Sequence, residues 1–231
     1  MSIANYIMKK ASRFLVNRAA RAEESGRLSN LGQWGLDVNA KGRLSVNGHD
    51  AVKLVDRFGS PLLVVNRKKL LEDTQRALSA FKCAPAGSKI LYSYKTNCIP
   101  GILKELHGAG LGAEVISPYE LWLAGKLGVQ GEDIVYNGVD KTPESIRAAL
   151  RMNILSINID SADEVERIHD IASELNTIAR VGVRLGFSDK SQFGLDVQGG
   201  EAMKVCEKIA ALKERLEFNC IHFNVTSNSR W

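Results

Sequence analysis

The sequence predicts an α/β protein with a parallel sheet, and the regularity of its pattern favours a (β/α)8-type barrel over an open sheet. From Pro61 onward, short β-branched runs alternate with stretches whose apolar residues recur at helical spacing. Several runs lack polar alternation, as expected of strands buried on both faces. Four runs begin at residues 90, 113, 134 and 154, close to the minimum spacing for a strand, a crossover helix and two loops. The expected strands are Leu62–Val65, Ile90–Tyr94, Ala113–Ile116, Ile134–Tyr136, Ile154–Ile159, Ile178–Leu185 and Phe218–Val225.

The helices between these runs are predicted from their start signals. Ser117 and Glu120 form a capping box around Pro118, and the segment Ser161–Glu164 repeats the device. Thr142-Pro143 and Ile99-Pro100 open two further helices. Because capping accounts for these residues, we assign them no chemistry.

The composition is that of a globular protein. Of the 231 residues, 45% are hydrophobic and 25% charged, which excludes a disordered, collagenous or coiled-coil chain. No stretch approaches the roughly 20 apolar residues of a membrane helix, and no secretory signal follows Met1. Cys83, Cys98, Cys206 and Cys220 have no C-x-x-C spacing, so no metal site is predicted. We expect reduced thiols and a cytoplasmic protein without a membrane partner.

Residues 1–27 hold most of the net charge of +5, with six basic residues against two acidic ones. A basic surplus at one end, without an interleaved aromatic platform, does not indicate nucleic-acid binding. Apolar residues recur at helical spacing between Tyr6 and Arg18. An organellar transit peptide and a helix docked by its apolar face are both open, and we favour the second. We therefore expect a basic amphipathic helix with its lead-in over residues 1–43 and the barrel domain over residues 44–231.

Five polar residues stand where the strands should be buried or should end, which is where a parallel barrel places its functional groups. Lys95 ends one run; a lysine there is by default a solvated surface charge. Glu114 and Arg184 interrupt apolar runs, and burying either without a partner is costly. They should pair with each other, with a ligand or with other polar groups, and a purely structural ion pair stays open. His222 and Asn224 share a face because they are two apart, and spacing alone indicates a buried, hydrogen-bonded histidine.

From about Leu44 to Ser227, the chain carries seven motifs in the order in which they occur in a known family. By these motifs it resembles the N-terminal part of the fold-type III pyridoxal-phosphate decarboxylases, the group containing diaminopimelate and ornithine decarboxylases. Tyr92-Ser-Tyr-Lys95-Thr-Asn97 stands in place of the family's Y-A-x-K-x-N, and His222-Phe-Asn-Val-Thr-Ser227 in place of H-x-H-[IV]-G-S. The others are Asn47–Asp50 with Phe58–Leu62, Glu114–Leu121 for D-V-V-S-x-x-E-L, Asn158–Ser161, Arg184, and Gln192–Gly194 for K-F-G.

The resemblance implies an alanine-racemase-like barrel in which Lys95 is catalytic and forms the internal aldimine with pyridoxal phosphate. It also implies that Ser227 hydrogen-bonds the cofactor phosphate and that Glu114 and Arg184 line the ring. Asn224 stands where the family places a histidine against that ring. The cofactor's ring would accept the electron pair left when carbon dioxide departs.

The chain departs from the family at several of these positions. Asn224 offers no aromatic face, Thr226 replaces a glycine, Gln192 replaces a lysine, and Glu114 is longer than the family's aspartate. These changes indicate a divergent subgroup. The family's glycine-rich phosphate loop, its E-P-G-R segment and its C-terminal β-domain do not occur before Trp231. With Leu62–Val65 outside the barrel, as in the family, we expect an incomplete barrel of about six strands.

The function implied is pyridoxal-phosphate-dependent decarboxylation of an amino acid, with diaminopimelate as the first substrate to test, weak or absent in this chain alone. A homodimer is implied for the full-length form. Two alternatives stay open, namely a non-enzymatic pyridoxal-phosphate-binding protein and a degenerate decarboxylase fragment.

Overall fold

The computed structural model describes residues 31–187 and 193–224, and the chain divides into two compact units between Asp73 and Thr74. Helix α3 (Arg67–Ala80) spans this division. The domain boundary predicted at residue 44 falls within the first unit, at the start of a strand. The basic helix predicted within residues 1–43 lies largely outside the described residues. In the described ranges, no helix is long and apolar enough to cross a membrane.

The first unit contains a small antiparallel sheet and a capped helix. Asn47 and Gly48 connect its second and third strands with φ angles of 48° and 83°, in the left-handed region that these two residue types tolerate best. The Asp50 carboxylate then caps the helix, accepting hydrogen bonds from the amides of Val52 at 2.9 Å and Lys53 at 3.3 Å. The elements are η1 (Leu31–Trp34), β1 (Leu36–Val38), β2 (Leu44–Val46), β3 (His49–Asp50) and α2 (Ala51–Phe58).

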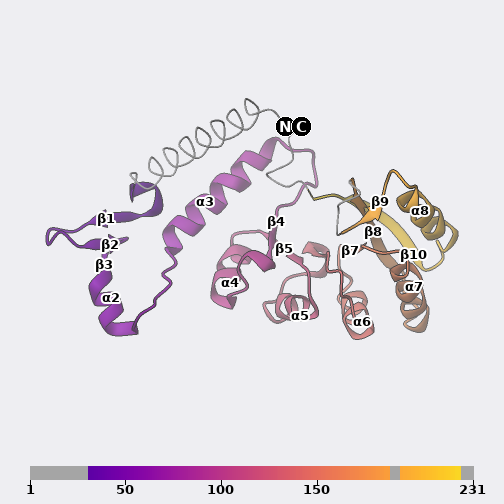
Figure 1. Cartoon of the computed structure of the whole chain (residues 1–231), viewed down its shortest axis with the longest axis horizontal. Coiled ribbons are helices and arrows are strands. Elements are labelled where there is room, and N and C mark those ends of the chain that lie inside the picture. Colours follow the sequence, from indigo (N-terminus) through magenta and orange to yellow (C-terminus); the bar gives the residue numbers. More distant parts are fainter. Residues whose placement is uncertain (1–30, 188–192, 225–231) are drawn as a thin grey trace, which may run out of the picture. The chain divides into compact units, whose positions relative to one another are not determined.

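The second unit is a parallel sheet whose strands lie side by side in chain order, as in a barrel wound in one direction (Figure 1). The short β9 (Leu195–Asp196) pairs with β8 beside this path. The predicted α/β class and six barrel strands are confirmed. The run Leu62–Val65 forms no strand, and with Leu63 94% exposed it has no sheet against which to be buried. The six strands are β4 (Leu91–Ser93), β5 (Gly112–Val115), β6 (Ile134–Tyr136), β7 (Ser156–Ile159), β8 (Ala179–Gly186) and β10 (Leu216–His222).

Helices connect successive strands and lie along the outer side of the sheet (Figure 1). Between sheet and helices lies the hydrophobic core, where Ile134, Ile157 and Val181 of the strands meet Leu121 and Ile168 of the helices. Burying each such side chain contributes about 1.5–3 kcal/mol. The helices are α4 (Pro100–Gly108), α5 (Pro118–Lys126), α6 (Pro143–Arg151), α7 (Glu164–Glu174) and α8 (Glu201–Ala211), with short turns η2 (Phe81–Cys83), η3 (Tyr94–Thr96) and η4 (Gly131–Asp133).

The start signals of the helices are largely confirmed. The Ser117 hydroxyl caps α5, accepting the Glu120 amide at 3.2 Å, and Thr142 caps α6 in the same way. The second predicted capping box is wrong. Helix α7 begins at Glu164, and the Ser161 hydroxyl donates to the Asp163 carboxylate at 2.5 Å because residues 161–163 form a turn before the helix.

The face of the sheet opposite the helices is called the lumen face below. In β10, a bulge changes which residues point to this face. Phe218 lies opposite Val181, which belongs to the core side, whereas Cys220 lies opposite Gly182. Asn219 is the extra residue between them. The bulge therefore turns the second half of β10 so that Cys220 lies on the lumen face.

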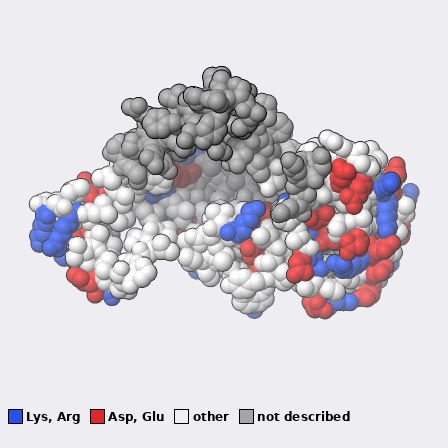
Figure 2. Space-filling model, in the orientation of Figure 1, with Lys and Arg blue, Asp and Glu red and all other residues white. Residues whose placement is uncertain are grey.

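Charged side chains of both signs are interspersed over the part of the second unit formed by α7 and α8 (Figure 2). Several are paired, as in Lys208 with Glu166 at 2.6 Å and Arg167 with Asp163 at 2.7 Å. Such exposed pairs contribute at most about 1 kcal/mol each. Neither sign of charge therefore predominates over α7 and α8 in that view.

Candidate functional site

Lys95 lies in η3, directly after β4, and its side chain is exposed. The neighbouring Tyr94 is fully buried, and its hydroxyl lies 2.6 Å from Nε2 of His107. Nδ1 of His107 lies 2.8 Å from the Leu111 carbonyl oxygen, which can only accept, so Nδ1 donates and Nε2 accepts from Tyr94. Burial raises the pKa of the Tyr94 hydroxyl and keeps it a donor. The turn that carries Lys95 is thus anchored to α4.

A chain of hydrogen bonds, called the lumen chain below, crosses the lumen face from Glu114 on β5. The Asn137 side-chain amide donates to Glu114 Oε1 at 2.8 Å, and the Asn158 amide donates to Asn137 Oδ1 at 2.6 Å. Asn158 Oδ1 accepts from the Ser156 hydroxyl at 2.8 Å and from the Cys220 thiol at 3.2 Å. Because a carboxylate can only accept, it fixes the orientation of both amides. Of the partners expected for Glu114, the structure therefore shows neutral polar groups. Arg184 is not part of this chain of hydrogen bonds.

Gly182 leaves the space in which this chain closes. A Cβ atom at Gly182 would lie 2.1 Å from Asn158 Oδ1 and 2.5 Å from Cys220 Sγ, both far inside van der Waals contact. Glycine is therefore the residue that allows β7, β8 and β10 to bring their polar side chains together.

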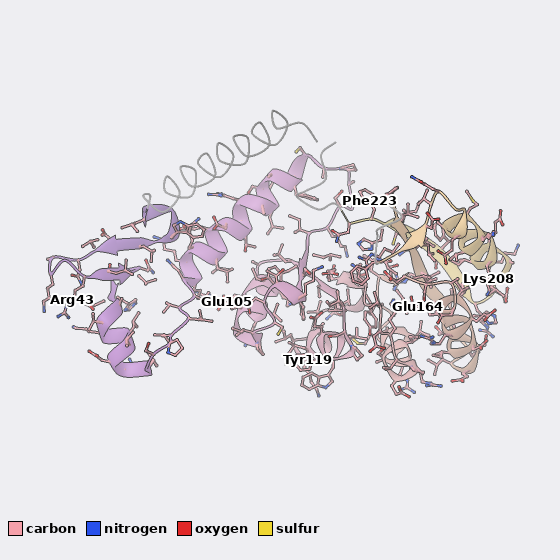
Figure 3. All side chains as sticks on the ribbon, viewed as in Figure 1. Arg43, Glu105, Tyr119, Glu164, Lys208 and Phe223 are labelled. Carbon is pink, nitrogen blue, oxygen red and sulfur yellow. The ribbon has the colours of Figure 1, made fainter. Side chains whose placement is uncertain are left out.

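Arg184 pairs with Asp160, which follows β7. Its Nη1 lies 2.7 Å from Asp160 Oδ1, and its guanidinium carbon lies 4.8 Å from the centre of the Phe193 ring. The Asp160 amide donates to Glu164 Oε2 at 2.9 Å, and Glu164 is paired in turn with Lys141. Figure 3 shows Glu164 in the interior of the second unit. Buried ionic groups thus hold the loop after β7, and with it Arg184, in place.

His222 is affected by charged residues on several strands and loops of the sheet. It lies opposite Arg184 in the register of β10 and β8. Burial and the charge of Arg184 lower the pKa of the His222 imidazole; Lys95 acts in the same direction, and Glu114 and Asp160 oppose them. Its Nδ1 is buried and, within the described residues, has no hydrogen-bond partner. The expectation of a fully hydrogen-bonded histidine is therefore wrong at Nδ1, because the described residues of the lumen face offer this atom no partner.

Glu120, at the start of α5, is a further carboxyl group to consider, and the residue is only 8% exposed. Its Oε2 accepts the Ile116 amide at 2.7 Å, one residue before the predicted capping partner. Burial and the charge of Glu114 raise the pKa of the Glu120 carboxyl, and Lys95 opposes this shift. Glu120 therefore interacts electrostatically with Lys95 and Glu114, in addition to its hydrogen bond at the start of the helix.

A cavity of about 390 Å³ opens beside His222, Asn158 and Cys220. It is lined by residues in or directly beside β6, β7 and β10, namely Val135, Leu155, Ser156, Asn158, Asn219, Cys220, Ile221, His222 and Phe223. Its walls combine apolar side chains with a few polar atoms, as is usual for sites that bind small organic molecules.

Of the predicted site residues, Lys95, Glu114 and Arg184 each act electrostatically on the His222 imidazole. Asn224 is exposed, two residues past the end of β10. Ser227, with the substituted positions Thr226 and Gln192, lies outside the described residues. Asn137 and Asn158 were not predicted as members of this hydrogen-bonded chain, and Glu120 was not predicted to interact electrostatically with Lys95. The signal for Asn137 was its position directly after β6.

Comparison with known proteins identifies the family. A family model described as "Pyridoxal-dependent decarboxylase, pyridoxal binding domain" matches residues 68–230. The chain belongs to this family. The resemblance found in the sequence is thereby confirmed, and pyridoxal is the cofactor on which this decarboxylase family depends.

Individual relatives and solved structures support the same family assignment. Diaminopimelate decarboxylase of Methanocaldococcus jannaschii is 33% identical over 203 residues, covering 80% of this chain and 46% of that protein. The Aquifex aeolicus enzyme is 33% identical over 199 residues, with coverage of 80% and 46%. The crystal structure of the M. jannaschii enzyme with L-lysine aligns with a TM-score of 0.78 at 31% identity, covering 84% of this chain and 48% of that one. SrLDC in complex with PLP and cadaverine aligns with a TM-score of 0.63 at 26% identity, covering 77% and 43%. The chain spans about half the length of the curated relatives it matches.

Proposed function

We propose that the chain is the pyridoxal-phosphate-binding part of an amino-acid decarboxylase and that Lys95 carries the cofactor. The observations that support this most directly are the membership of the pyridoxal-dependent decarboxylase family and the register of the sheet, which places Arg184 opposite His222 and Glu114 opposite Ser93, two residues before Lys95. Lys95 is exposed at a strand end, so an aldehyde could reach its amine without displacing protein.

The residues present fit such a cofactor. In the described part of the chain, two buried polar atoms without partners, Ser93 Oγ and His222 Nδ1, lie on strands of this sheet and could each pair with a polar atom of a bound ring. Arg184 offers a guanidinium fixed by Asp160. We propose Glu114, Arg184, Asn224 and Ser227 as further cofactor-binding residues.

When bound, pyridoxal phosphate supplies a ring that accepts the electrons released by loss of a carboxyl group. The protein's part is binding, orientation and proton control. The Glu120 carboxyl, whose pKa is raised by burial against the opposing charge of Lys95, holds a proton at a higher pH than an exposed carboxyl does. His222, whose pKa is lowered, stays neutral at pH 7, so its ring can donate or accept without adding charge.

The experiment that tests the proposal is Lys95→Ala in the full 231-residue chain. Titration with pyridoxal phosphate should produce the visible absorbance of a lysine-bound cofactor in the wild type and none in Lys95→Ala. The matched control is Lys89→Ala, which removes a lysine that lies before β4, at the opposite end of the strand from Lys95, and is paired with Asp133 at 2.6 Å. The control should bind the cofactor normally. Equal absorbance from wild type and Lys95→Ala would refute the role of Lys95.

We propose diaminopimelate as the first substrate to assay, because the first relatives named above act on it. Carbon dioxide release from diaminopimelate, ornithine and lysine should be compared. That this chain alone turns over weakly or not at all is a separate prediction. Cofactor binding by the full-length protein without carbon dioxide release from any of the three would favour the non-enzymatic alternative. A homodimer in the full-length form and a cytoplasmic location are further proposals; light scattering of the full-length protein tests the first.

A further inference from the structure

Ser93 ends β4 with a buried hydroxyl that has no partner. Its Oγ is inaccessible to solvent and, among the described residues, forms no hydrogen bond. Ser93 lies opposite Glu114 in the register of β4 and β5, and paired residues of adjacent strands point to the same face of a sheet. The hydroxyl therefore lies on the lumen face, two residues before Lys95.

Other buried serines in the second unit do have partners. The Ser145 hydroxyl accepts from Tyr136 at 3.1 Å and donates to the Thr142 carbonyl at 2.8 Å. The Ser156 hydroxyl donates to Asn158 at 2.8 Å. A buried hydroxyl left unpaired lowers the stability of the folded chain, so its presence calls for a compensating contact.

The local sequence supports the same conclusion. The motif Y-A-x-K-x-N, which this segment resembles, has alanine where this chain has Ser93. Alanine would fill the position without any unpaired polar atom. The extra oxygen therefore has no structural role that the described residues account for, and it lies two residues before the one proposed to carry the cofactor.

We propose that the Ser93 hydroxyl hydrogen-bonds the pyridoxal group held at Lys95, which makes Ser93 a cofactor-binding residue of this chain. The inference rests on the proposed function. A polar substituent of a bound ring would supply the missing partner once the groups that cover the hydroxyl move aside, and the free energy lost in burying the hydroxyl would be recovered only when the cofactor is present.

The test is Ser93→Ala in the full chain, with two measurements. Affinity for pyridoxal phosphate, followed by absorbance, should fall about three- to tenfold, the equivalent of one neutral hydrogen bond. Urea unfolding without cofactor should show a midpoint that is unchanged or higher, because an unpaired buried hydroxyl has been removed. Ser145→Ala is the matched control and should behave oppositely, with normal affinity and a lower midpoint, because it removes a hydroxyl that has partners.

An unchanged affinity in Ser93→Ala would overturn the inference, and so would a lower unfolding midpoint without cofactor, which would mean that the hydroxyl has a structural partner. A loss seen only when an amino acid is added to the cofactor-loaded chain would also overturn it. If instead the wild type fails to bind pyridoxal phosphate, or Lys95→Ala binds it equally well, the proposed function fails and not the Ser93 contact alone.

Discussion

The ion pair between Lys141 and Glu164 makes a sharp prediction about stability. Both side chains are buried, at 0% and 1% exposure, and Lys141 Nζ lies 3.0 Å from each Glu164 oxygen while also donating to the Gly138 carbonyl. Lys141→Met keeps the length of the side chain and removes its charge, leaving Glu164 with the Asp160 amide as its remaining donor. Removing one member of a buried pair costs about 3–5 kcal/mol. Burial raises the pKa of Glu164, so proton uptake by that carboxyl should keep the loss toward the lower value.

Urea unfolding followed by circular dichroism measures this loss. Lys208→Met, the same substitution in the exposed pair with Glu166, is the control and should cost less than about 1 kcal/mol. Adding Glu164→Gln to Lys141→Met removes the stranded charge and should restore part of the stability. The reasoning is wrong if Lys141→Met costs no more than the control, or if the double variant is as unstable as the single one.

Three further predictions concern single side chains. Gly182→Ala should lower the unfolding free energy by about 1–3 kcal/mol in the same urea assay, because its Cβ would overlap the Asn158 oxygen; a neutral result would mean that the lumen chain yields freely. His222 should make stability pH-dependent: because its folded pKa lies below the ordinary 6.5, its contribution is present above that pH and is lost as the pH falls through the folded value. Urea midpoints between about pH 7 and pH 5 should therefore fall less in His222→Gln than in the wild type, and parallel curves would contradict this. Arg147→Ala, which breaks an exposed pair with α7, should change stability by less than about 1 kcal/mol at low salt, and a larger loss would show that this pair supports packing of the two helices.

Much of the fold could be predicted because strands buried on both faces leave continuous apolar runs at regular spacing. The β10 strand shows the limit of this reasoning. Phe218, Cys220 and His222 are spaced by two, which predicts one shared face. The bulge at Asn219 places Phe218 opposite Val181 and Cys220 on the lumen face. An extra residue in a strand has no periodic signature, so the sequence could not reveal it.

The site was predictable where a charge interrupted an apolar run, as Glu114 and Arg184 do, because such burial demands a partner. Their partners were not predictable. Glu114 bonds to Asn137, 23 residues away, and Asn158 bonds to Cys220, 62 residues away. Neutral amides at strand ends are common, so only the register of the sheet shows which of them meet.

The lumen chain is also a row of aligned dipoles. Each amide presents its N–H end toward Glu114 and its oxygen toward Ser156 and Cys220. Hydrogen bonds in such a row polarise one another, so the negative charge on β5 is stabilised partly by groups on β7 and β10. The electrostatic environment beside Lys95 is therefore a shared property of several strands, and a neutral substitution at the far end of the row changes it without touching any charged residue.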